Sequence, residues 1–274
     1  MGIAATERHG GSRIREITTQ ARIAGTGRWL LTGEKCWVSR LTEATGFVAF
    51  FRDPDGQISA AIIDARGAGL EREVTEPSGL GGWSWGTLRL HDVPVEVDKQ
   101  LLGAPGEGLA IFHRHFTAFR PLVTATALGT AASVHQHVLS ALATRRQAGI
   151  LARIRDNALI TLGRTHAEIL AELTAVLTAG RLAANNHPLA DLIARSGKAA
   201  GADTANRVVA HLAPLIGAAG YQRAHPVAKA RADLAGLLYA DGIHDSLYRS
   251  AGQALLQRVP MDATVPALVN LRAA

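Results

Sequence analysis

The spacing of apolar residues along the chain changes near residue 103. Before that point, short apolar runs alternate with turn residues. Residues 46–51 and 57–63 flank the sequence RDPDG, whose proline, aspartate and glycine favour a turn, and this pattern predicts a β-hairpin. Residues 87–95 also alternate, and we expect Pro94 to end their pairing because proline cannot donate to a strand ladder.

After residue 108 the period becomes helical. Across 159–177 the apolar residues recur at steps of three and four, which places them on one helix face. Segments 121–143 and 189–215 show the same spacing, with Pro121 acceptable in the first turn of its helix. A break at 221–226 precedes two shorter predicted helices.

These patterns predict an α+β protein with two domains. We expect residues 1–103 to form a small antiparallel β-barrel or sandwich, because short strands are separated by glycines at regular intervals. Residues 104–274 are expected to form a bundle of four helices.

One strand segment carries an unusual pair of side chains. Residues 27–32 and 33–39 predict a strand, a tight turn at Gly33 and a second strand. Strand alternation would place Trp37 and Ser39 on the same face. In one interpretation this is an ordinary sheet face with one large residue. In the other it is a wall for a flat, polar-edged molecule.

Composition excludes several classes of protein. The 274 residues are 47% hydrophobic and 19% charged, as in ordinary globular proteins. Cys36 is the only cysteine, so no internal disulfide can form, and we expect a cytoplasmic protein. No apolar run reaches 18 residues, so no membrane span is expected. The net charge of +6 comes from scattered arginines rather than a dense basic run, which argues against nucleic-acid binding. The arginines are either ordinary surface residues or a sign of an anionic cofactor or substrate.

The order of several short motifs resembles the acyl-CoA dehydrogenase family. That family reads T-E-x-x-x-G-S, G-x-K-x-W-I-[ST], D-V-x-V-P, E-R-x-Q-F-G, G-G-x-G-Y and Y-E-G-T along its chain. The corresponding segments are TERHGGS (6–12), GEKCWVS (33–39), DVPV (92–95), TRRQAG (144–149), GAAGY (217–221) and ADGI (240–243). No single segment is specific, but together they extend over almost the whole chain.

The resemblance implies that FAD binds between the two domains and a neighbouring subunit. Trp37 would cover the flavin ring, Ser39 would bond near its N5 atom, and Thr6 would reach its pyrimidine edge. Ser12 matches a serine that contacts the acyl-thioester arm. The expected partners are an acyl-CoA or acyl-carrier-protein substrate and further copies of the chain in a homodimer or homotetramer.

Four more residues match the family's dinucleotide-binding motifs. Arg145 and Gln147 match the arginine and glutamine of E-R-x-Q-F-G, and the arginine suits a pyrophosphate. Gly217 and Gly220 fall on the glycine-rich turn that approaches the cofactor. The alternatives are solvated residues at a helix end for the first pair, and a turn that stops a helix for the second.

The resemblance assigns the catalytic base to Asp241. The family removes an α-proton with the glutamate of Y-E-G-T, and Asp241 is one methylene shorter. A second branch takes its base from the position of Phe119, which cannot accept a proton. The alternative for Asp241 is a structural carboxylate before Gly242.

Other positions depart from the family's pattern. Pro214 and Ile243 replace a glutamine and a threonine that hold FAD, and Ala148 replaces a phenylalanine. The family's N-terminal helical domain is expected to be absent, since the first motif begins at Thr6. Three explanations stay open: a fragment or mis-started reading frame, a separate polypeptide that supplies this domain, or a shortened relative.

The remaining aromatic and histidine residues carry weaker hypotheses. The H-x-H pairs at 113–115 and 135–137 do not predict a metal site, because residues two apart on a helix face different ways. His244 is either an acid–base group or a surface residue. The segment GGWSWG (81–86) is either a rigid loop or a pocket wall.

Three functional hypotheses follow from the resemblance. The first is an FAD-dependent dehydrogenase that desaturates an acyl thioester. The second keeps the fold but uses reduced flavin and oxygen as a monooxygenase, which needs no carboxylate base. The third is a catalytically incomplete subunit that works only with a helical partner.

Overall fold

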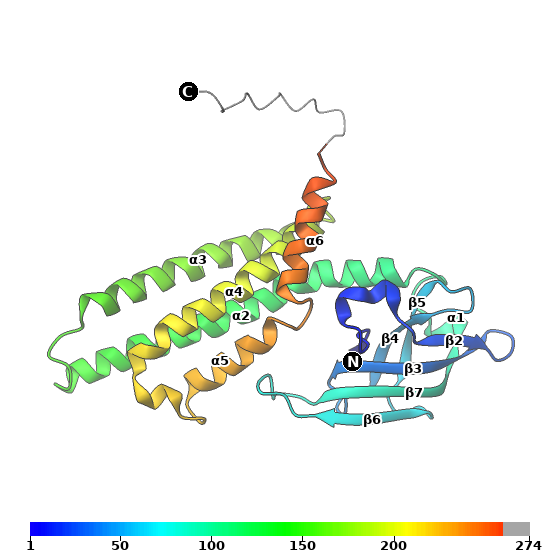
Figure 1. Ribbon diagram of the computed structural model, residues 1–274, viewed down its shortest axis with the longest axis horizontal. Coiled ribbons are helices and arrows are strands. Elements are labelled where there is room, and N and C mark those ends of the chain that lie inside the picture. Colours follow the sequence, from blue (N-terminus) through cyan, green and yellow to red (C-terminus); the bar gives the residue numbers. More distant parts are fainter. Residues whose placement is uncertain (260–274) are drawn as a thin grey trace, which may run out of the picture.

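A computed structural model describes residues 1–259, which form a sheet domain and a helical bundle joined by one long helix (Figure 1). The seven strands make a single sheet. Six of them follow the order β1-β4-β2-β3-β7-β6, and the seventh, β5, pairs with β4. The strands are β1 (Gly2–Ala4), β2 (Gln20–Ile23), β3 (Arg28–Ser39), β4 (Gly46–Arg52), β5 (Ile58–Asp64), β6 (Leu70–Thr75) and β7 (Trp85–Glu96), with a short 3-10 helix, η1, at Gly11–Glu16.

The sheet is mostly antiparallel, and it corrects two expectations from the sequence. The pairs β1–β4 and β2–β4 are parallel. The predicted turn at Gly33 is wrong, because β3 is continuous and the hairpin turn lies between Ala24 and Arg28. Pro94 does not end pairing either. It lies opposite Leu30, and β7 continues to Glu96.

Two of the helices extend beyond the expected segments 121–143 and 159–177 at both ends, whereas a third matches the expected segment 189–215 to within one residue. The helices are α1 (Val97–Gln100), α2 (Gly108–Gln147), α3 (Asp156–Ala184), α4 (Ala190–Ile216), η2 (Ala218–Tyr221), α5 (Pro226–Leu237) and α6 (His244–Leu256). Pro121 was expected in a first turn but lies inside α2. The first turn of α2 packs on β5 so closely that a side chain at Gly108 would lie 2.7 Å from the Ile58 carbonyl oxygen.

The α+β architecture predicted from the sequence is confirmed, whereas its exact domain boundary stays a prediction. The boundary at residue 103 falls between α1 and α2. The final residues of the predicted helical domain, 260–274, lie outside the described residues. Within 1–259, no helix combines the length and the apolar character needed to cross a membrane.

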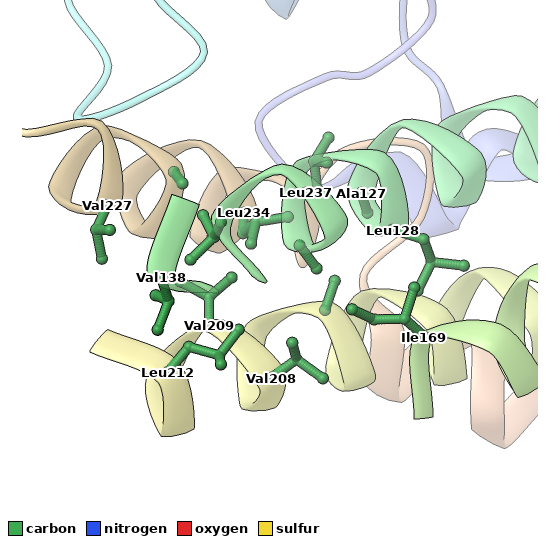
Figure 2. Close-up of a cluster of buried hydrophobic side chains, with 14 of the residues drawn as sticks. Ala127, Leu128, Val138, Ile169, Val208, Val209, Leu212, Val227, Leu234 and Leu237 are labelled. Carbon is green, nitrogen blue, oxygen red and sulfur yellow. The ribbon is translucent and has the colours of Figure 1, made fainter. Parts of the chain in front are cut away.

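A core of small and branched side chains holds the helices together. Figure 2 shows Val138 from α2, Val209 and Leu212 from α4, and Leu234 from α5 converging in this cluster. Alanines at facing positions, such as Ala127 and Ala205, are fully buried. Side chains this small let helix axes approach closely, which explains the alanine-rich composition of this half of the chain.

The sheet domain contains a buried ion pair between Glu7 and Lys35. The two charged atoms lie 2.8 Å apart, and the side chains are 4% and 0% exposed. The Glu7 carboxylate also accepts hydrogen bonds from the backbone amides and hydroxyls of Thr18 and Thr19. Thr19 can reach this position because residue 33 is glycine. A side chain there would lie 2.7 Å from the Thr19 Cα atom.

The loop between β6 and β7 connects the sheet domain to α5. The Leu80 amide donates to Asp233, with the two atoms 2.7 Å apart, and the Trp85 indole donates to the Leu80 carbonyl. Gly79 lies so close to α5 that a side chain would come within 2.4 Å of the Ala232 backbone. These contacts fix Gly79, Leu80 and Trp85, whereas Gly81 and Gly82 between them have open space around them, so both interpretations of GGWSWG stay open.

Breaking the Glu7–Lys35 pair on one side should strongly destabilise the sheet domain. Lys35→Met leaves the Glu7 carboxylate buried without its counter-charge, and we expect the free energy of unfolding to fall by about 3–5 kcal/mol. Urea unfolding followed by tryptophan fluorescence measures this directly. All four tryptophans, at positions 29, 37, 83 and 85, lie in the sheet domain or its loop.

The double variant Glu7→Gln/Lys35→Met is the control, because it removes both charges and should lose less stability than Lys35→Met alone. Burial opposes ionisation of Glu7, but Lys35 and the threonine donors outweigh it and lower its pKa from 4.5 to about 2. This contribution to stability is therefore present above pH 4.5 and disappears as the pH falls towards about 2. A single variant as stable as wild type at pH 7 would contradict this account.

Gly79→Ala should loosen the contact between the sheet domain and α5. The added methyl group cannot fit against the Ala232 backbone, and overpacking of this kind costs about 1–3 kcal/mol. Gly81→Ala is the matched control, since a side chain at Gly81 meets nothing within 4 Å. We expect hydrogen exchange in 76–85 to accelerate only in Gly79→Ala. Equal exchange in the two variants would exclude this packing constraint.

Candidate functional site

Trp37 is presented to solvent by an irregularity in β3. Lys35 lies opposite Leu88 and Val38 opposite Gly86, so two residues of β3 face one residue of β7, which is a β-bulge. Trp37 has a φ angle of +57°, which is uncommon for a bulky residue, and it is 62% exposed. An exposed aromatic side chain on strained backbone is more typical of a binding site than of a sheet face.

Two other predicted flavin-binding residues lie beside this bulge. The Thr6 carbonyl accepts a hydrogen bond from the Cys36 amide, with the two atoms 2.8 Å apart, so Thr6 is fixed next to Trp37. Ser39 is half-buried and lies opposite Trp85 at the end of β3. Ser12 is exposed on η1. Thr6, just after β1, and Trp37 and Ser39 of β3 therefore lie in one region of the sheet domain, and their contact with a flavin stays a prediction.

Asp241 lies in the loop between α5 and α6, at the end of the bundle that faces the sheet domain (Figure 1). Its backbone is also left-handed, with a φ angle of +56°, and it is followed by Gly242 at +110°. The Asp241 carbonyl accepts a hydrogen bond from the Arg120 guanidinium of α2 at 3.2 Å. The Gly242 carbonyl accepts one from the Lys198 ammonium of α4 at 2.6 Å.

The surroundings of Asp241 shift its protonation equilibrium. Burial raises the pKa of Asp241, while Lys198, His115 and Arg120 oppose this shift without cancelling it. Burial lowers the pKa of Lys198 to about 8, with Asp241 acting in the opposite direction. A buried carboxylate of raised pKa beside a lysine, an arginine and an imidazole is typical of a catalytic site.

His115 is the least satisfied polar side chain around Asp241. Its ring stacks on Phe119 with centroids 5.2 Å apart, and burial lowers its pKa. The Nε2 atom is buried and is the one such side-chain nitrogen or oxygen within residues 1–259 that has no hydrogen-bond partner. Buried polar atoms are rarely left in this state, so His115 marks this face of α2 as part of the site.

The four predicted dinucleotide-binding residues lie at the opposite end of the bundle. Arg145 is half-buried and Gln147 exposed in the last turn of α2. Gly217 ends α4 with a φ angle of +79° and open space around it, and Gly220 is buried in η2. Helical rise places Arg145 roughly 40 Å along α2 from Arg120. Within one chain, these four residues are therefore far from Trp37 and Asp241.

The sequence analysis missed the residues that support these side chains. Lys35 and Lys198 each lie on the buried face of their strand or helix. The residue four positions earlier on the same face is buried and apolar in both cases, Leu31 for Lys35 and Ala194 for Lys198. A lysine in such a position signals a buried charge, and its partner must be sought elsewhere. Glu7 was visible only as part of TERHGGS, and Arg120 only as the residue after Phe119.

The structure gives little chemical role to the other histidines. His244 lies at the start of α6, where its Nε2 atom is 4.0 Å from Asp203 and 3.5 Å from Asp245. These contacts favour a local structural role. Nε2 of His135 lies 3.0 Å from the Leu162 carbonyl. Among residues 1–259, no three His, Cys, Asp or Glu side chains gather in a way that would hold a metal ion.

Comparison with known proteins identifies the family. The acyl-CoA dehydrogenase middle-domain model matches residues 2–93, and the acyl-CoA dehydrogenase C-terminal-domain model matches residues 106–256. The chain belongs to the acyl-CoA dehydrogenase family. The resemblance inferred from the motifs is thus confirmed.

Individual relatives are distant. The chain is 25% identical over 241 residues to a glutaryl-CoA dehydrogenase of Desulfococcus multivorans, an alignment that spans 83% of this chain and 59% of that protein. Its fold is similar to butyryl-CoA dehydrogenase from Megasphaera elsdenii, with a TM-score of 0.83, 22% identity, and coverage of 93% and 67%. It is also similar to an acyl-CoA dehydrogenase complexed with FAD from Bacillus anthracis, with a TM-score of 0.81, 19% identity, and coverage of 93% and 47%.

Proposed function

We propose that this protein acts in the α,β-desaturation of an acyl thioester, with Asp241 as the base that removes the α-proton. The observation that carries the proposal is the environment of Asp241, a carboxylate of raised pKa held in a left-handed turn among Lys198, His115 and Arg120. A base with raised proton affinity works closer to neutral pH than an exposed aspartate does. Family membership supplies the reaction class.

The residues beside the β-bulge fit a flavin ring. Trp37 offers an exposed aromatic side chain. Thr6 is hydrogen-bonded to the residue before Trp37, and Ser39 lies two residues after it, so two residues with hydroxyl groups are close by. Stacking and hydrogen bonds to ring nitrogens and carbonyls are the means by which proteins bind and tune flavins. When bound, FAD would accept the hydride that leaves the β-carbon of the substrate. A family member from Bacillus anthracis is described as complexed with FAD.

The dinucleotide-binding residues support an assembly. Because α2 separates Arg145 from the Asp241 end by roughly 40 Å, the two groups of residues serve one cofactor only if they come from different copies of the chain. The open turn at Gly217 and the half-buried Arg145 suit a pyrophosphate at that far end. A homodimer or homotetramer therefore belongs to the proposal.

Asp241 would carry out its step with the help of the surrounding helices. The carboxylate takes the α-proton, and the electron pair of that C–H bond forms the new double bond as hydride leaves the β-carbon. Phe119 occupies the alternative base position and stacks on His115, and it is 37% exposed. The relative named glutaryl-CoA dehydrogenase supports a coenzyme A thioester as the substrate class.

Replacing the proposed base should abolish the reaction. Asp241→Asn keeps the shape of the side chain but cannot accept a proton, and we expect kcat/KM to fall at least about a hundredfold. Because burial raises the pKa of Asp241, the wild-type rate should fall on the acid side at a pH above 3.8, the ordinary aspartate value. Anaerobic turnover of acyl-CoA thioesters by the FAD-loaded protein gives both results.

Asp245→Asn is the matched control, since the same chemical change then falls on a side chain that is 88% exposed. This variant should keep wild-type kcat/KM. Full anaerobic activity in Asp241→Asn would exclude Asp241 as the base. Turnover that occurs only with oxygen and a reductase, in wild type and in Asp241→Asn alike, would instead favour the monooxygenase hypothesis.

A further inference from the structure

Two buried cations from different helices bind consecutive carbonyl oxygens of the Asp241–Gly242 turn. Arg120 is 8% exposed and Lys198 is 1% exposed. Arg120 donates from Nε to the Asp241 carbonyl at 3.2 Å, and Lys198 donates from Nζ to the Gly242 carbonyl at 2.6 Å. The turn is therefore held from α2 on one side and from α4 on the other.

This arrangement is costly enough to need an explanation. An ammonium group has three hydrogen-bond donors and is strongly hydrated in water, so burying it is unfavourable unless it is well paired. Asp241 also has a left-handed backbone, which is uncommon for a residue with a side chain, although aspartate adopts it more readily than most. The buried ammonium and the left-handed backbone occur at the same turn. Both are accounted for if the hydrogen bond from Lys198 holds the turn in the left-handed form.

The two cations are not equivalent. Arg120 also forms an ion pair with Asp191, with the charged atoms 3.6 Å apart, so part of its charge is neutralised on α4. Lys198 has the Gly242 carbonyl as its hydrogen-bond acceptor, and Asp241 is the first carboxylate that acts on its charge, followed by Asp203. Of the two cations, Lys198 therefore interacts mainly with this turn, whereas Arg120 also interacts with Asp191.

We infer that Lys198 is a positioning residue for Asp241: by binding the Gly242 carbonyl it holds the turn in one form and keeps the short aspartate carboxylate in one orientation. The inference rests on the proposed role of Asp241 as the base. A carboxylate one methylene shorter than glutamate has less reach, so a loose turn would cost it more. Lys198 therefore supports catalysis without touching the substrate.

The charges around Asp241 predict the direction in which its pKa should change when the Lys198 charge is removed. The charged groups that face Asp241 are Lys198 from α4 and Arg120 and His115 from α2, and Asp203 faces Lys198. Lys198 opposes the rise in the pKa of Asp241 that burial causes. If the ammonium is removed, the Asp241 carboxyl should hold its proton up to a higher pH than in wild type.

The test is a carbon NMR titration of the Asp241 carboxyl, assigned by its absence in Asp241→Asn. In Lys198→Met the titration midpoint should move to higher pH, and hydrogen exchange in 238–244 should accelerate at least about tenfold. Lys198→Arg should restore both towards wild type, because it keeps the charge and a donor. Lys229→Met is the control, since Lys229 is an exposed residue paired with Asp233.

A second neutral variant covers the case in which Lys198→Met does not fold. Lys198→Gln keeps a donor for the Gly242 carbonyl but loses the charge, so the midpoint should still rise while exchange changes less. If the midpoint and the exchange rates are as in wild type in a folded Lys198→Met or Lys198→Gln protein, Lys198 does not position Asp241. The same conclusion follows if Lys198→Arg behaves like Lys198→Met.

Turnover separates this inference from the proposed function. If both hold, Lys198→Met lowers kcat by about ten- to a hundredfold with little change in KM and moves the acid limb of the pH profile upward. Lys198→Arg then regains most of kcat. If Asp241→Asn is fully active, the proposed base is wrong, and the NMR titration still decides whether Lys198 holds the turn.

Discussion

The buried ion pair between Glu7 and Lys35 is the constraint on which the sheet half of the site depends. Glu7 follows Thr6 directly, and Lys35 comes two residues before Trp37. Their 2.8 Å contact therefore fixes two distant segments in one register. A buried pair adds little net stability, because desolvation offsets the attraction between the charges. The pair instead favours one register of the two segments, because any other register would leave the Glu7 or Lys35 charge buried without a partner.

The helical half of the site follows the same physical logic. Arg120 and Lys198 are buried, and they bind the backbone of the loop that carries Asp241. Trp37 and Asp241 both have left-handed backbones, and a buried lysine lies near each in the chain or in space: Lys35 two residues before Trp37, and Lys198 bound to the Gly242 carbonyl. In both halves, the residue proposed to act on the ligand has a left-handed backbone, and buried charged residues hold the segment around it.

Sequence patterns predicted the large features because these depend on periodicity. The helix expected at 189–215 is α4, and the hairpin of 46–51 and 57–63 is β4–β5. Irregular features were missed. Gly33 predicted a turn but marks a place where Thr19 packs against the strand, and Pro94 lies within a strand despite having no amide hydrogen. These depend on what lies across the sheet, which a local pattern does not contain.

The candidate site was predictable only in part for the same reason. Motif order located Thr6, Trp37, Ser39 and Asp241, but it could not show that Lys198 binds the turn after Asp241, because 44 residues separate Lys198 from Gly242. Motif order also could not show that Arg145 lies roughly 40 Å from Arg120. This distance follows from α2 being one continuous helix from Gly108 to Gln147. Long-range contacts and element lengths needed the structure.

The most direct test of the central claim is a visible absorbance spectrum of the purified protein after it is mixed with FAD and desalted, followed by anaerobic addition of an acyl-CoA thioester. The account predicts that the flavin spectrum is retained and that it bleaches on addition of the thioester, because hydride passes to the bound flavin as Asp241 takes the proton. A colourless protein after desalting, or a retained flavin that no acyl-CoA thioester bleaches, would contradict it.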